Sequence, residues 1–292
     1  MKEARGFVVI DKPPGITSHD VVARVRRAVG LRRVGHGGTL DPMATGVLVV
    51  AVGDATRLLQ WVSGGDKCYD ATVRLGSSTS TDDAEGEVVE VATEEALNNV
   101  TDSEIGRVVD TFRGSILQVP STVSAIKREG VPAYARVRAG ESFELDPRPV
   151  RITTLEWSML NRHTQSVDLQ VHVCCSSGTY VRALARDIGR ALGVGGHLTS
   201  LRRTRVGEFS LDDAIPLDGI TDDTLIPLAS AAQRLLPTVT VSSEDEAHVR
   251  HGRPIPWPAG VTGTVALLDA DGSLRAVCHD VEGVTRYDCV FA

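Results

Sequence analysis

The feature that most constrains the fold is a run of six apolar residues, Val47–Val52, with a glycine on each side. A short apolar run between turn residues is typical of a strand buried on both faces. Two later segments, 69–75 and 167–173, alternate apolar and polar residues, as half-buried strands do. Helical patterns lie between these strands without regular alternation. We therefore expect an α+β fold rather than a doubly wound parallel sheet.

The segment 17–30 has the end signals of a helix. Thr17 and Ser18 offer N-cap oxygens, and Gly30 provides the C-terminal stop. Its apolar stripe consists of Val21, Val22, Val25, Ala28 and Val29. Three arginines, Arg24, Arg26 and Arg27, fall roughly 100° or more from the centre of this stripe, so we expect them to face solvent. A shorter helix, capped by Asp54, is expected to run to about Val62.

A further helix is predicted after the turn at 176–179, ending at about Leu192. Arg182, Arg186 and Arg190 recur every four residues along one of its faces. Arg182 lies in the first turn, where the helix dipole disfavours a cation unless an anion sits close by. A carboxylate such as Asp41, or a phosphate, would meet that need.

The chain changes character after Pro237. Proline and glycine become frequent, and Asp271-Gly272 gives a hairpin signal between two short apolar segments, 265–268 and 274–278. We place a domain boundary near 236–240 and predict a small all-β module over 237–292. No period of 20–50 residues repeats, which argues against solenoids and propellers.

Composition and cysteine usage indicate the compartment. Hydrophobic residues make up 42% of the chain and charged residues 24%, enough for a folded core. No apolar run approaches the roughly 20 residues that cross a bilayer, and the start lacks a signal sequence, so we expect a soluble intracellular protein. The five cysteines are Cys68, Cys174, Cys175, Cys278 and Cys289. Their odd count, without a CxxC pair, favours reduced, partly buried thiols over disulfides or a zinc site.

The net charge of −7 argues by itself against a nucleic-acid ligand. The charge is uneven, however. Residues 1–60 hold nine Lys or Arg against five acids, and 182–210 hold six Arg against two acids. In contrast, 81–104 carries nine acids and no base, and 211–246 carries eight acids and one Arg. Such segregation suits a protein that presents one cationic face to an anionic partner.

The densest chemical signal is the sequence HGGTLDPMATG at 36–46, directly before the apolar run. Its glycines place the carboxylate of Asp41 on an irregular loop where a backbone can approach a ligand closely. They match neither dinucleotide nor P-loop fingerprints. Two other segments stand out: Lys67-Cys68-Tyr69 at the start of an alternating strand, and SGTYVR at 177–182.

Taken together with DKPPG at 11–15 and GHLTSLRR at 196–203, these segments resemble the TruB family of bacterial tRNA pseudouridine(55) synthases in order and spacing. The resemblance covers about 1–235. It implies the pseudouridine synthase fold, with a central mixed or antiparallel sheet and flanking helices. It also implies a catalytic domain at 1–236 with an RNA-gripping insertion at about 118–150, followed by a short PUA-like domain at 237–292.

The resemblance also implies site residues, carried over motif by motif. Asp41 matches the catalytic aspartate, Tyr69 the active-site tyrosine and Arg182 the arginine that pairs with the aspartate. The expected substrate-binding residues are His36, which fills the space left by the flipped nucleotide, Leu201 of the uracil pocket, Tyr180, and Lys12 in a supporting loop. Whether the carboxylate attacks the base, attacks C1′ or removes a sugar proton stays open.

The chain departs from the family at 119–125, where the usual PPxYSA-like run reads VPSTVSA. Lys127, Tyr134 and Arg136 still follow. The phosphate-facing surface is expected to include the arginines of both helices with Arg202, Arg203 and Arg205. No cofactor and no metal are expected. The expected partner is the T-stem-loop of tRNA, bound by a cytoplasmic monomer that needs neither a protein partner nor a membrane.

Three other functions fit parts of the pattern. A retaining glycosidase needs two carboxylates about 5 Å apart, and no second acid accompanies Asp41 in the motif segments. A non-catalytic RNA-binding protein or RNA chaperone would share the basic surface but has no need of Asp41, Tyr69 and Arg182 together. A guide-dependent subunit of a ribonucleoprotein is disfavoured by the lack of extended basic tails and by the short C-terminal module.

Overall fold

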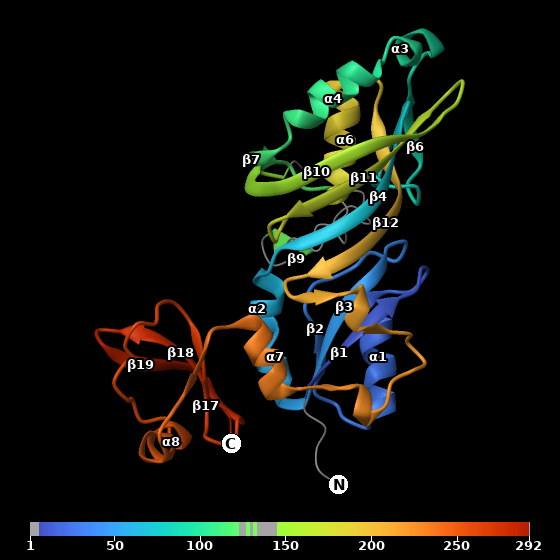
Figure 1. The fold of residues 1–292 in the computed structure, drawn as a ribbon. Coiled ribbons are helices and arrows are strands. Elements are labelled where there is room, and N and C mark those ends of the chain that lie inside the picture. Colours follow the sequence, from blue (N-terminus) through green and yellow to red (C-terminus); the bar gives the residue numbers. More distant parts are fainter. Residues whose placement is uncertain (1–5, 123–126, 129–130, 133–144, 292) are drawn as a thin grey trace. The chain divides into compact units, whose positions relative to one another are not determined.

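The computed structural model describes residues 6–122, 127–128, 131–132 and 145–291 (Figure 1). The chain divides into two compact units. The first unit comprises Met1–Pro42, Gly46–Gly64 and Val206–Ala292, and the second comprises Met43–Thr45 and Gly65–Arg205. None of the helices within the described ranges is long and apolar enough to span a membrane.

In the first unit, β1 (Gly6–Lys12) is the central strand. It pairs antiparallel with β3 (Thr45–Val52) and β15 (Ile226–Pro227), and parallel with β14 (Ala214–Ile215). Strand β2 (Val34–His36) pairs with β3. The sheet is therefore mixed, as expected. The other elements before the C-terminal module are α1 (Ser18–Val29), η1 (Gly53–Leu58), α2 (Leu59–Gly64), β13 (Phe209–Ser210), η2 (Leu211–Asp213), η3 (Asp222–Thr224) and α7 (Leu228–Leu235).

Helix α1 confirms the predicted ends. Thr17 is the N-cap and forms a capping box with Asp20, and Gly30 takes the left-handed conformation at the C-cap. The three arginines face solvent, as predicted. The buried stripe is narrower than expected, because Ala28 is exposed and Val29 only half-buried. The prediction that Asp54 caps the following helix was wrong. Val52 is the N-cap of η1, and Asp54 lies in its first turn, paired with Arg33 at 2.8 Å.

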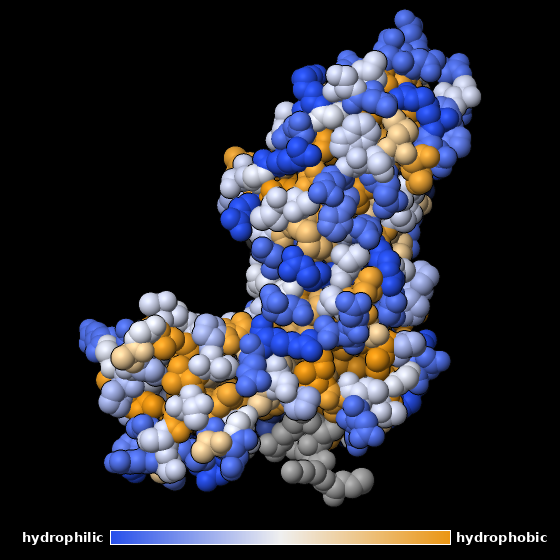
Figure 2. All heavy atoms as spheres, viewed as in Figure 1, coloured by the Kyte–Doolittle hydropathy of each residue, from blue (hydrophilic) through white to orange (hydrophobic). Residues whose placement is uncertain are grey.

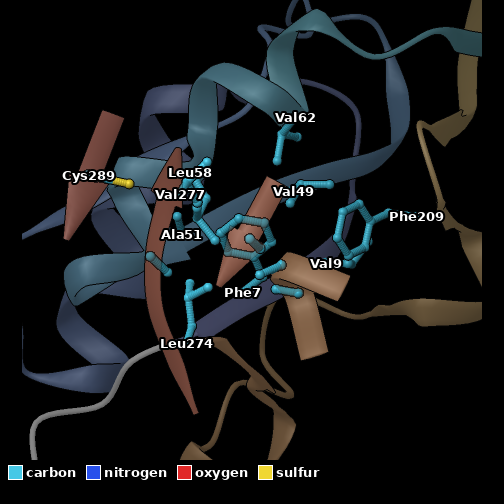
Figure 3. Close-up of a cluster of buried hydrophobic side chains, with 14 of the residues drawn as sticks. Phe7, Val9, Val49, Ala51, Leu58, Val62, Phe209, Leu274, Val277 and Cys289 are labelled. Atoms are coloured by element: carbon cyan, nitrogen blue, oxygen red, sulfur yellow. The ribbon is translucent and has the colours of Figure 1, made fainter. Parts of the chain in front are cut away.

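The core of the first unit forms around the apolar run of β3 (Figure 3). Val47–Val52 is fully buried, as predicted for a strand covered on both faces. Phe7 of β1 packs against Phe209 with ring centroids 5.7 Å apart. The same cluster includes Val277 and Cys289 from the C-terminal strands, so these strands share this core. Removing such apolar side chains from water is the main favourable contribution to the free energy of folding.

The C-terminal module is a four-stranded sheet in the order β16 (Thr238–Thr240), β17 (Val265–Leu268), β18 (Leu274–Val281) and β19 (Val284–Val290). The predicted hairpin at Asp271-Gly272 joins β17 to β18. The sequence pattern missed one helix, α8 (Ser243–Arg250). Val249 is the only described buried residue of α8. The helix therefore lacks the apolar stripe by which a helix is recognised in a sequence. Figure 2 shows hydrophobic residues among hydrophilic ones on the visible face of this module.

In the second unit, the strands of the large sheet follow in the order β12 (Gly196–Val206), β4 (Lys67–Leu75), β11 (Val167–Cys175), β10 (Arg148–Arg162) and β7 (Gly114–Gln118). The last four pair antiparallel with one another. Helix α6 (Val181–Ala191) packs against β4, and α4 (Asp102–Asp110) packs against β10 and α6. The remaining elements are β5 (Ser77–Thr79), β6 (Val88–Val91), α3 (Glu94–Asn98), β8 (Lys127–Arg128) and β9 (Val131–Pro132).

Both alternating strands of the second unit form where the pattern predicts them. Tyr69 and the other predicted inward residues of β4 are buried. Asp168 of β11 is also buried, although the alternation predicts an exposed side chain. Arg74 on the adjacent strand β4 explains this, because its guanidinium donates two hydrogen bonds of 2.7 Å to the Asp168 carboxylate.

The prediction of fully reduced cysteines was wrong for one pair. Cys68 and Cys174 form a disulfide, because the register of β4 and β11 places them directly opposite each other. They are 106 residues apart, so no local spacing reveals the bond. Cys175, Cys278 and Cys289 are free and buried, as predicted.

Candidate active site

The backbone on both sides of Asp41 is fixed by hydrogen bonds within the first unit. On one side, the Ser18 hydroxyl accepts from the Leu40 amide at 2.8 Å and donates to the Leu40 carbonyl at 3.0 Å. On the other side, the Pro42 carbonyl accepts from the Gly15 amide at 2.8 Å. Asp41 itself is half-buried. The backbone that carries this partly accessible carboxylate is therefore held in place, which is the first requirement for positioning a reacting group.

Lys12 adds a third anchor to this loop. Its side chain is fully buried, and its ammonium donates to the carbonyls of Pro13 at 2.9 Å, Ile16 at 2.7 Å and Pro42 at 3.2 Å. A buried charge needs such partners to offset its lost hydration. The expected position in a supporting loop agrees with this environment, which favours holding the loop over touching a substrate.

Two glycines of the HGGTLDPMATG loop are required by its shape. A Cβ at Gly37 would lie 2.3 Å from Cγ1 of Val62 in α2, far inside van der Waals contact. Gly38 has a φ of +114°, which side-chain-bearing residues rarely adopt. His36 precedes them at the end of β2, opposite Val50. Its half-buried ring meets the His19 ring edge-on, with centroids 5.4 Å apart.

In the second unit, Arg182 lies in the first turn of α6 and is 4% exposed. Its Nη1 donates to the Thr81 carbonyl at 2.8 Å, and its Nε lies 3.5 Å from the equally buried carboxylate of Asp83. Asp83 thus supplies an anion of the kind predicted for this position. The neighbouring Asp82, with a φ of +61°, pairs with Arg186 at 3.1 Å.

The acidic turn at 81–83 was missed as a part of the site. The sequence showed it only as the start of an acidic stretch, and nothing local indicates that α6 lies beside it. Gln118 was missed for the same reason. It is buried, its side-chain oxygen accepts from the Tyr180 amide at 2.8 Å, and its amide donates to the Tyr180 carbonyl at 3.1 Å. These two bonds fix the backbone where α6 begins.

Tyr69 and Leu201 come from neighbouring strands of the second unit, β4 and β12. Both are largely buried, with 7% and 8% of their surface exposed. Two residues before Tyr69, burial and the nearby positive charge of Arg203 lower the pKa of Lys67 to about 8. Burial raises the pKa of the Cys175 thiol to about 11, which leaves it protonated and unreactive at neutral pH.

The predicted residues thus fall into two sets. Lys12, His36 and Asp41 belong to the first unit. Tyr69, Tyr180, Arg182 and Leu201 belong to the second. Each set is held by buried hydrogen bonds or strand packing within its own unit. The pairing of Asp41 with Arg182 stays a prediction. Tyr134 and Arg136 of the insertion lie outside the described residues.

Two models of known protein families match the sequence. The sequence model described as TruB family pseudouridylate synthase (N terminal domain) matches residues 26–181. The tRNA pseudouridylate synthase B C-terminal domain model matches 182–239. The chain belongs to the TruB family. This TruB-family chain is therefore an isomerase of the pseudouridine synthase class, with the α+β fold of that class.

Relatives of similar length support this membership. The tRNA pseudouridine synthase B of Mycobacterium sp. (strain KMS) is 51% identical over 277 residues, which cover 94% of this TruB chain and 92% of the relative. That of Thermobifida fusca is 47% identical over 294 residues, 99% of each chain. Among solved structures, a Cbf5-Nop10-Gar1 complex contains a chain with a TM-score of 0.72 and 30% identity, covering 98% of this chain and 85% of that one.

Proposed function

We propose that this enzyme converts the uridine at position 55, in the T loop of tRNA, into pseudouridine, with Asp41 as the reacting carboxylate. The observation that carries the proposal is the double anchoring of the Asp41 backbone, through Leu40 and Pro42, within the family motif. The names of the relatives, tRNA pseudouridine synthase B, support tRNA as the substrate.

The reaction breaks the bond from N1 of uracil to C1′, turns the base over and joins C5 to C1′. No atom is lost overall, because the proton that leaves C5 is balanced by one that N1 gains. An ionised carboxylate can assist at the base, at C1′ or at a sugar proton. Each of these roles needs Asp41 charged and correctly aimed, and a guanidinium such as that of Arg182 would provide both.

The roles of the remaining residues follow from their chemistry. Tyr69 offers a flat face for stacking uracil and a hydroxyl that can move the C5 proton. Leu201 would form part of the apolar wall of the uracil pocket. Because the base is stacked within its loop, it must be flipped out at a cost of a few kcal/mol. His36, filling the vacated space, would offset part of that cost, and Tyr180 would contact the flipped nucleotide.

Phosphate contacts would come from exposed arginines. Arg24, Arg26 and Arg27 of α1 are exposed and suit this role. Arg182 and Arg203 do not, because only 4% and 1% of their surfaces are exposed, and we remove both from the predicted phosphate-facing set. We further propose that the enzyme acts in the cytoplasm as a monomer, without a cofactor, a guide RNA or a protein partner, and that residues 237–292 form a PUA-like RNA-binding domain.

The decisive experiment is tritium release from [5-³H]uridine in a T-stem-loop transcript, with purified enzyme as the only protein. Asp41→Asn should abolish release, while the affinity for tRNA stays within a few-fold, because the change removes the reacting group and no phosphate contact. Asp54→Asn is the matched control. Asp54 lies in the same unit and its half-buried carboxylate pairs with the exposed Arg33, away from the motif loop in sequence, so its loss should leave the rate unchanged.

Appreciable turnover by the Asp41→Asn variant would refute the assignment of this residue. Tight tRNA binding by the wild type without any turnover would favour the RNA-binding alternative. Turnover that appears only after a guide RNA or another protein is added would favour a ribonucleoprotein subunit instead. Mass-spectrometric mapping of the product would show whether position 55 is the site.

A further inference from the structure

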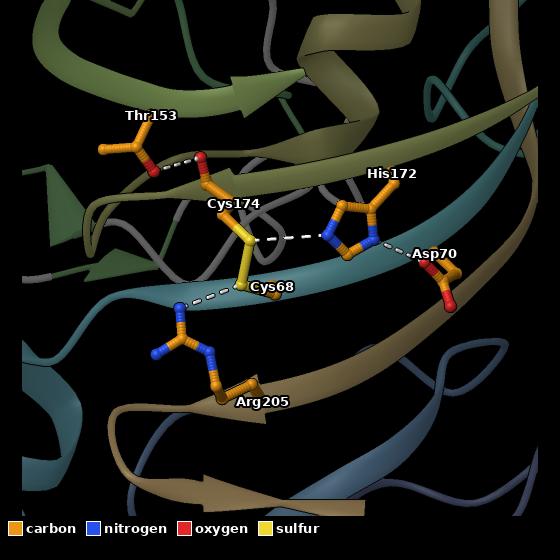
Figure 4. The surroundings of a disulfide bond; sticks show 6 residues. All are labelled: Cys68, Asp70, Thr153, His172, Cys174 and Arg205. Atoms are coloured by element: carbon orange, nitrogen blue, oxygen red, sulfur yellow. Dashed lines mark hydrogen bonds and ion pairs between the residues drawn. A yellow bond between two sulfur atoms is a disulfide. The ribbon is translucent and has the colours of Figure 1, made fainter. Parts of the chain in front are cut away.

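Three side chains that commonly bind metal ions meet on adjacent strands of the second unit (Figure 4). They are Cys68 on β4 and His172 and Cys174 on β11. Cys68 and Cys174 are directly opposite in the strand register, and His172 lies two residues from Cys174, on the same face. Their ligand atoms all lie within 4.8 Å of one another. Within the described ranges of the chain, this is the only such group of three.

The imidazole of His172 is oriented as a metal ligand would be. Its Nδ1 lies 2.7 Å from a carboxylate oxygen of Asp70, the residue opposite it on β4. Its Nε2 points toward the Cys174 sulfur at 3.6 Å, as Figure 4 shows. A carboxylate on one ring nitrogen is the usual arrangement around metal-binding histidines, because it fixes the tautomer that leaves the other nitrogen free to coordinate.

We propose that the reduced protein binds one Zn²⁺ through Cys68, Cys174 and His172, and that the disulfide closes this site. A dithiol reductant supplies two electrons and two protons, and becomes a disulfide while Cys68 and Cys174 become thiols. Zn²⁺ then displaces both thiol protons and binds two thiolates and the neutral imidazole. Oxidation by a disulfide reverses the sequence and releases the ion.

The geometry fits this ion. Tetrahedral zinc has Zn–S distances of about 2.3 Å and Zn–N distances of about 2.0–2.1 Å, which place its ligand atoms roughly 3.3–3.8 Å apart. The observed 3.6 Å between the Cys174 sulfur and the His172 Nε2 lies in this range. The two sulfurs can move apart to such a distance once the bond between them is reduced. The His172 side chain is 40% exposed, so solvent can deliver the ion and supply a water as fourth ligand.

The charges also balance. Two thiolates cancel the charge of the ion, and a further cation lies beside the site, since the guanidinium of Arg205 donates to the Cys68 sulfur at 3.1 Å. Two sulfurs and one imidazole favour thiophilic ions such as Zn²⁺ over Mg²⁺ or Ca²⁺, which prefer oxygen. None of the site's three ligands is a predicted catalytic residue, although Cys68 directly precedes Tyr69 on β4.

The test uses the full-length protein, reduced with a phosphine and freed of metal under anaerobic conditions. Titration with Co²⁺, as a spectroscopic probe of the zinc site, should give thiolate-to-cobalt absorption in the near ultraviolet and tetrahedral bands in the visible. Zn²⁺ should displace Co²⁺ at one ion per chain. Oxidation of the wild type to the disulfide should abolish binding, and reduction should restore it.

Substitutions should follow the ligand set. Cys68→Ser, Cys174→Ser and His172→Gln should each weaken binding at least 10-fold, and Asp70→Asn about 10-fold. Cys175→Ser is the control for a cysteine of the same strand. His279→Gln is the control for a histidine, because His279 also pairs with an aspartate, Asp288, at 3.2 Å. Neither control should change the affinity.

The proposal fails if the reduced wild type gives no thiolate-to-cobalt absorption. It also fails if a folded Cys68→Ser/Cys174→Ser double variant binds the ion as tightly as the wild type. Where a variant does not fold by circular dichroism, the comparison of reduced and oxidised wild type decides, since it needs no substitution. Equal Zn²⁺ affinity in both redox states would overturn the proposal.

Discussion

The hydroxyl of Ser18 makes two hydrogen bonds to the backbone of Leu40, one to its amide and one to its carbonyl. Ser18 is the first residue of α1, and Leu40 directly precedes Asp41. Both Ser18 and Leu40 are almost fully buried. The start of α1 therefore holds the loop of the proposed catalytic carboxylate, and the strength of this link can be measured by removing the hydroxyl.

Ser18→Ala should destabilise the protein by about 1–3 kcal/mol, because it leaves the buried amide and carbonyl of Leu40 without this partner. The same change should lower the turnover number more than the affinity for RNA, because it loosens the loop that carries Asp41. Urea unfolding measures the first effect, and tritium release at saturating RNA the second. Ser243→Ala is the control, since Ser243 begins α8 and is exposed. Wild-type stability in the Ser18→Ala variant would contradict the anchoring role.

Lys12→Met tests the other side of the loop. The substitution keeps the buried stem but removes the ammonium that donates to the Pro42 carbonyl. We expect turnover to fall at least 10-fold, since small misplacements of a reacting group are costly. The tRNA dissociation constant should change by less than about 3-fold, because a fully buried ammonium cannot touch a phosphate. A loss of affinity without a loss of turnover would instead indicate direct contact with RNA.

Local patterns predicted much of the fold because their causes are local. The Thr17 cap, the Gly30 stop and the alternation of β4 act over a few residues and can be recognised without knowing the rest of the chain. The burial of Asp168 and the Cys68–Cys174 bond depend on the register between β4 and β11, which lie about a hundred residues apart. Such register is set by the assembled sheet, so no single segment reveals it.

The candidate site divides in the same way. The motif around Asp41 and the SGTYVR turn could be recognised from residue order alone. The partners of Arg182 could not, since Thr81 and Asp83 reach it only when α6 packs beside their turn. Gln118, which holds the backbone of Tyr180, was hidden for the same reason. Sequence therefore indicated candidate reacting groups, but it did not indicate the residues that hold Arg182 and Tyr180.

Arg182→Lys should lower turnover by about 100-fold. A lysine lacks the planar fork that contacts the Thr81 carbonyl and the Asp83 carboxylate, and it would orient a second carboxylate poorly. The comparison is with Arg107→Lys, an exposed position on α4 of the same unit, which should retain wild-type turnover. Single-turnover rates on the T-stem-loop separate the two. Equal rates in both variants would argue against a role for Arg182 in the reaction.

Asp168→Asn should destabilise the protein by about 1–2 kcal/mol at pH 7, because it weakens a two-bond contact with Arg74. That hydrogen-bonded contact lowers the pKa of Asp168. A lowered carboxyl pKa means that the stabilisation is present above about pH 4 and is lost as the pH falls through the folded-state value. Urea unfolding should therefore show the difference from wild type shrinking below pH 4. Asp110→Asn is the control, because Asp110 forms an exposed pair with Arg113. It should change the free energy of unfolding little at any pH.

Lys67→Met should stabilise the protein at pH 7, by roughly 1–3 kcal/mol, because burial lowers the pKa of Lys67 from 10.5 to about 8. Below pH 8 the folded wild type carries a buried ammonium that the unfolded chain hydrates freely. As the pH rises from 8 toward 10.5, the folded state loses this proton before the unfolded chain does, so the wild type becomes more stable. The difference in the free energy of unfolding between the variant and the wild type therefore shrinks. Urea unfolding at pH 7, 8, 9 and 10 measures this difference. Arg107→Met, which removes an exposed cation from α4, controls for general charge effects. A difference in the free energy of unfolding that does not change with pH would show that the buried Lys67 ammonium does not destabilise the wild type.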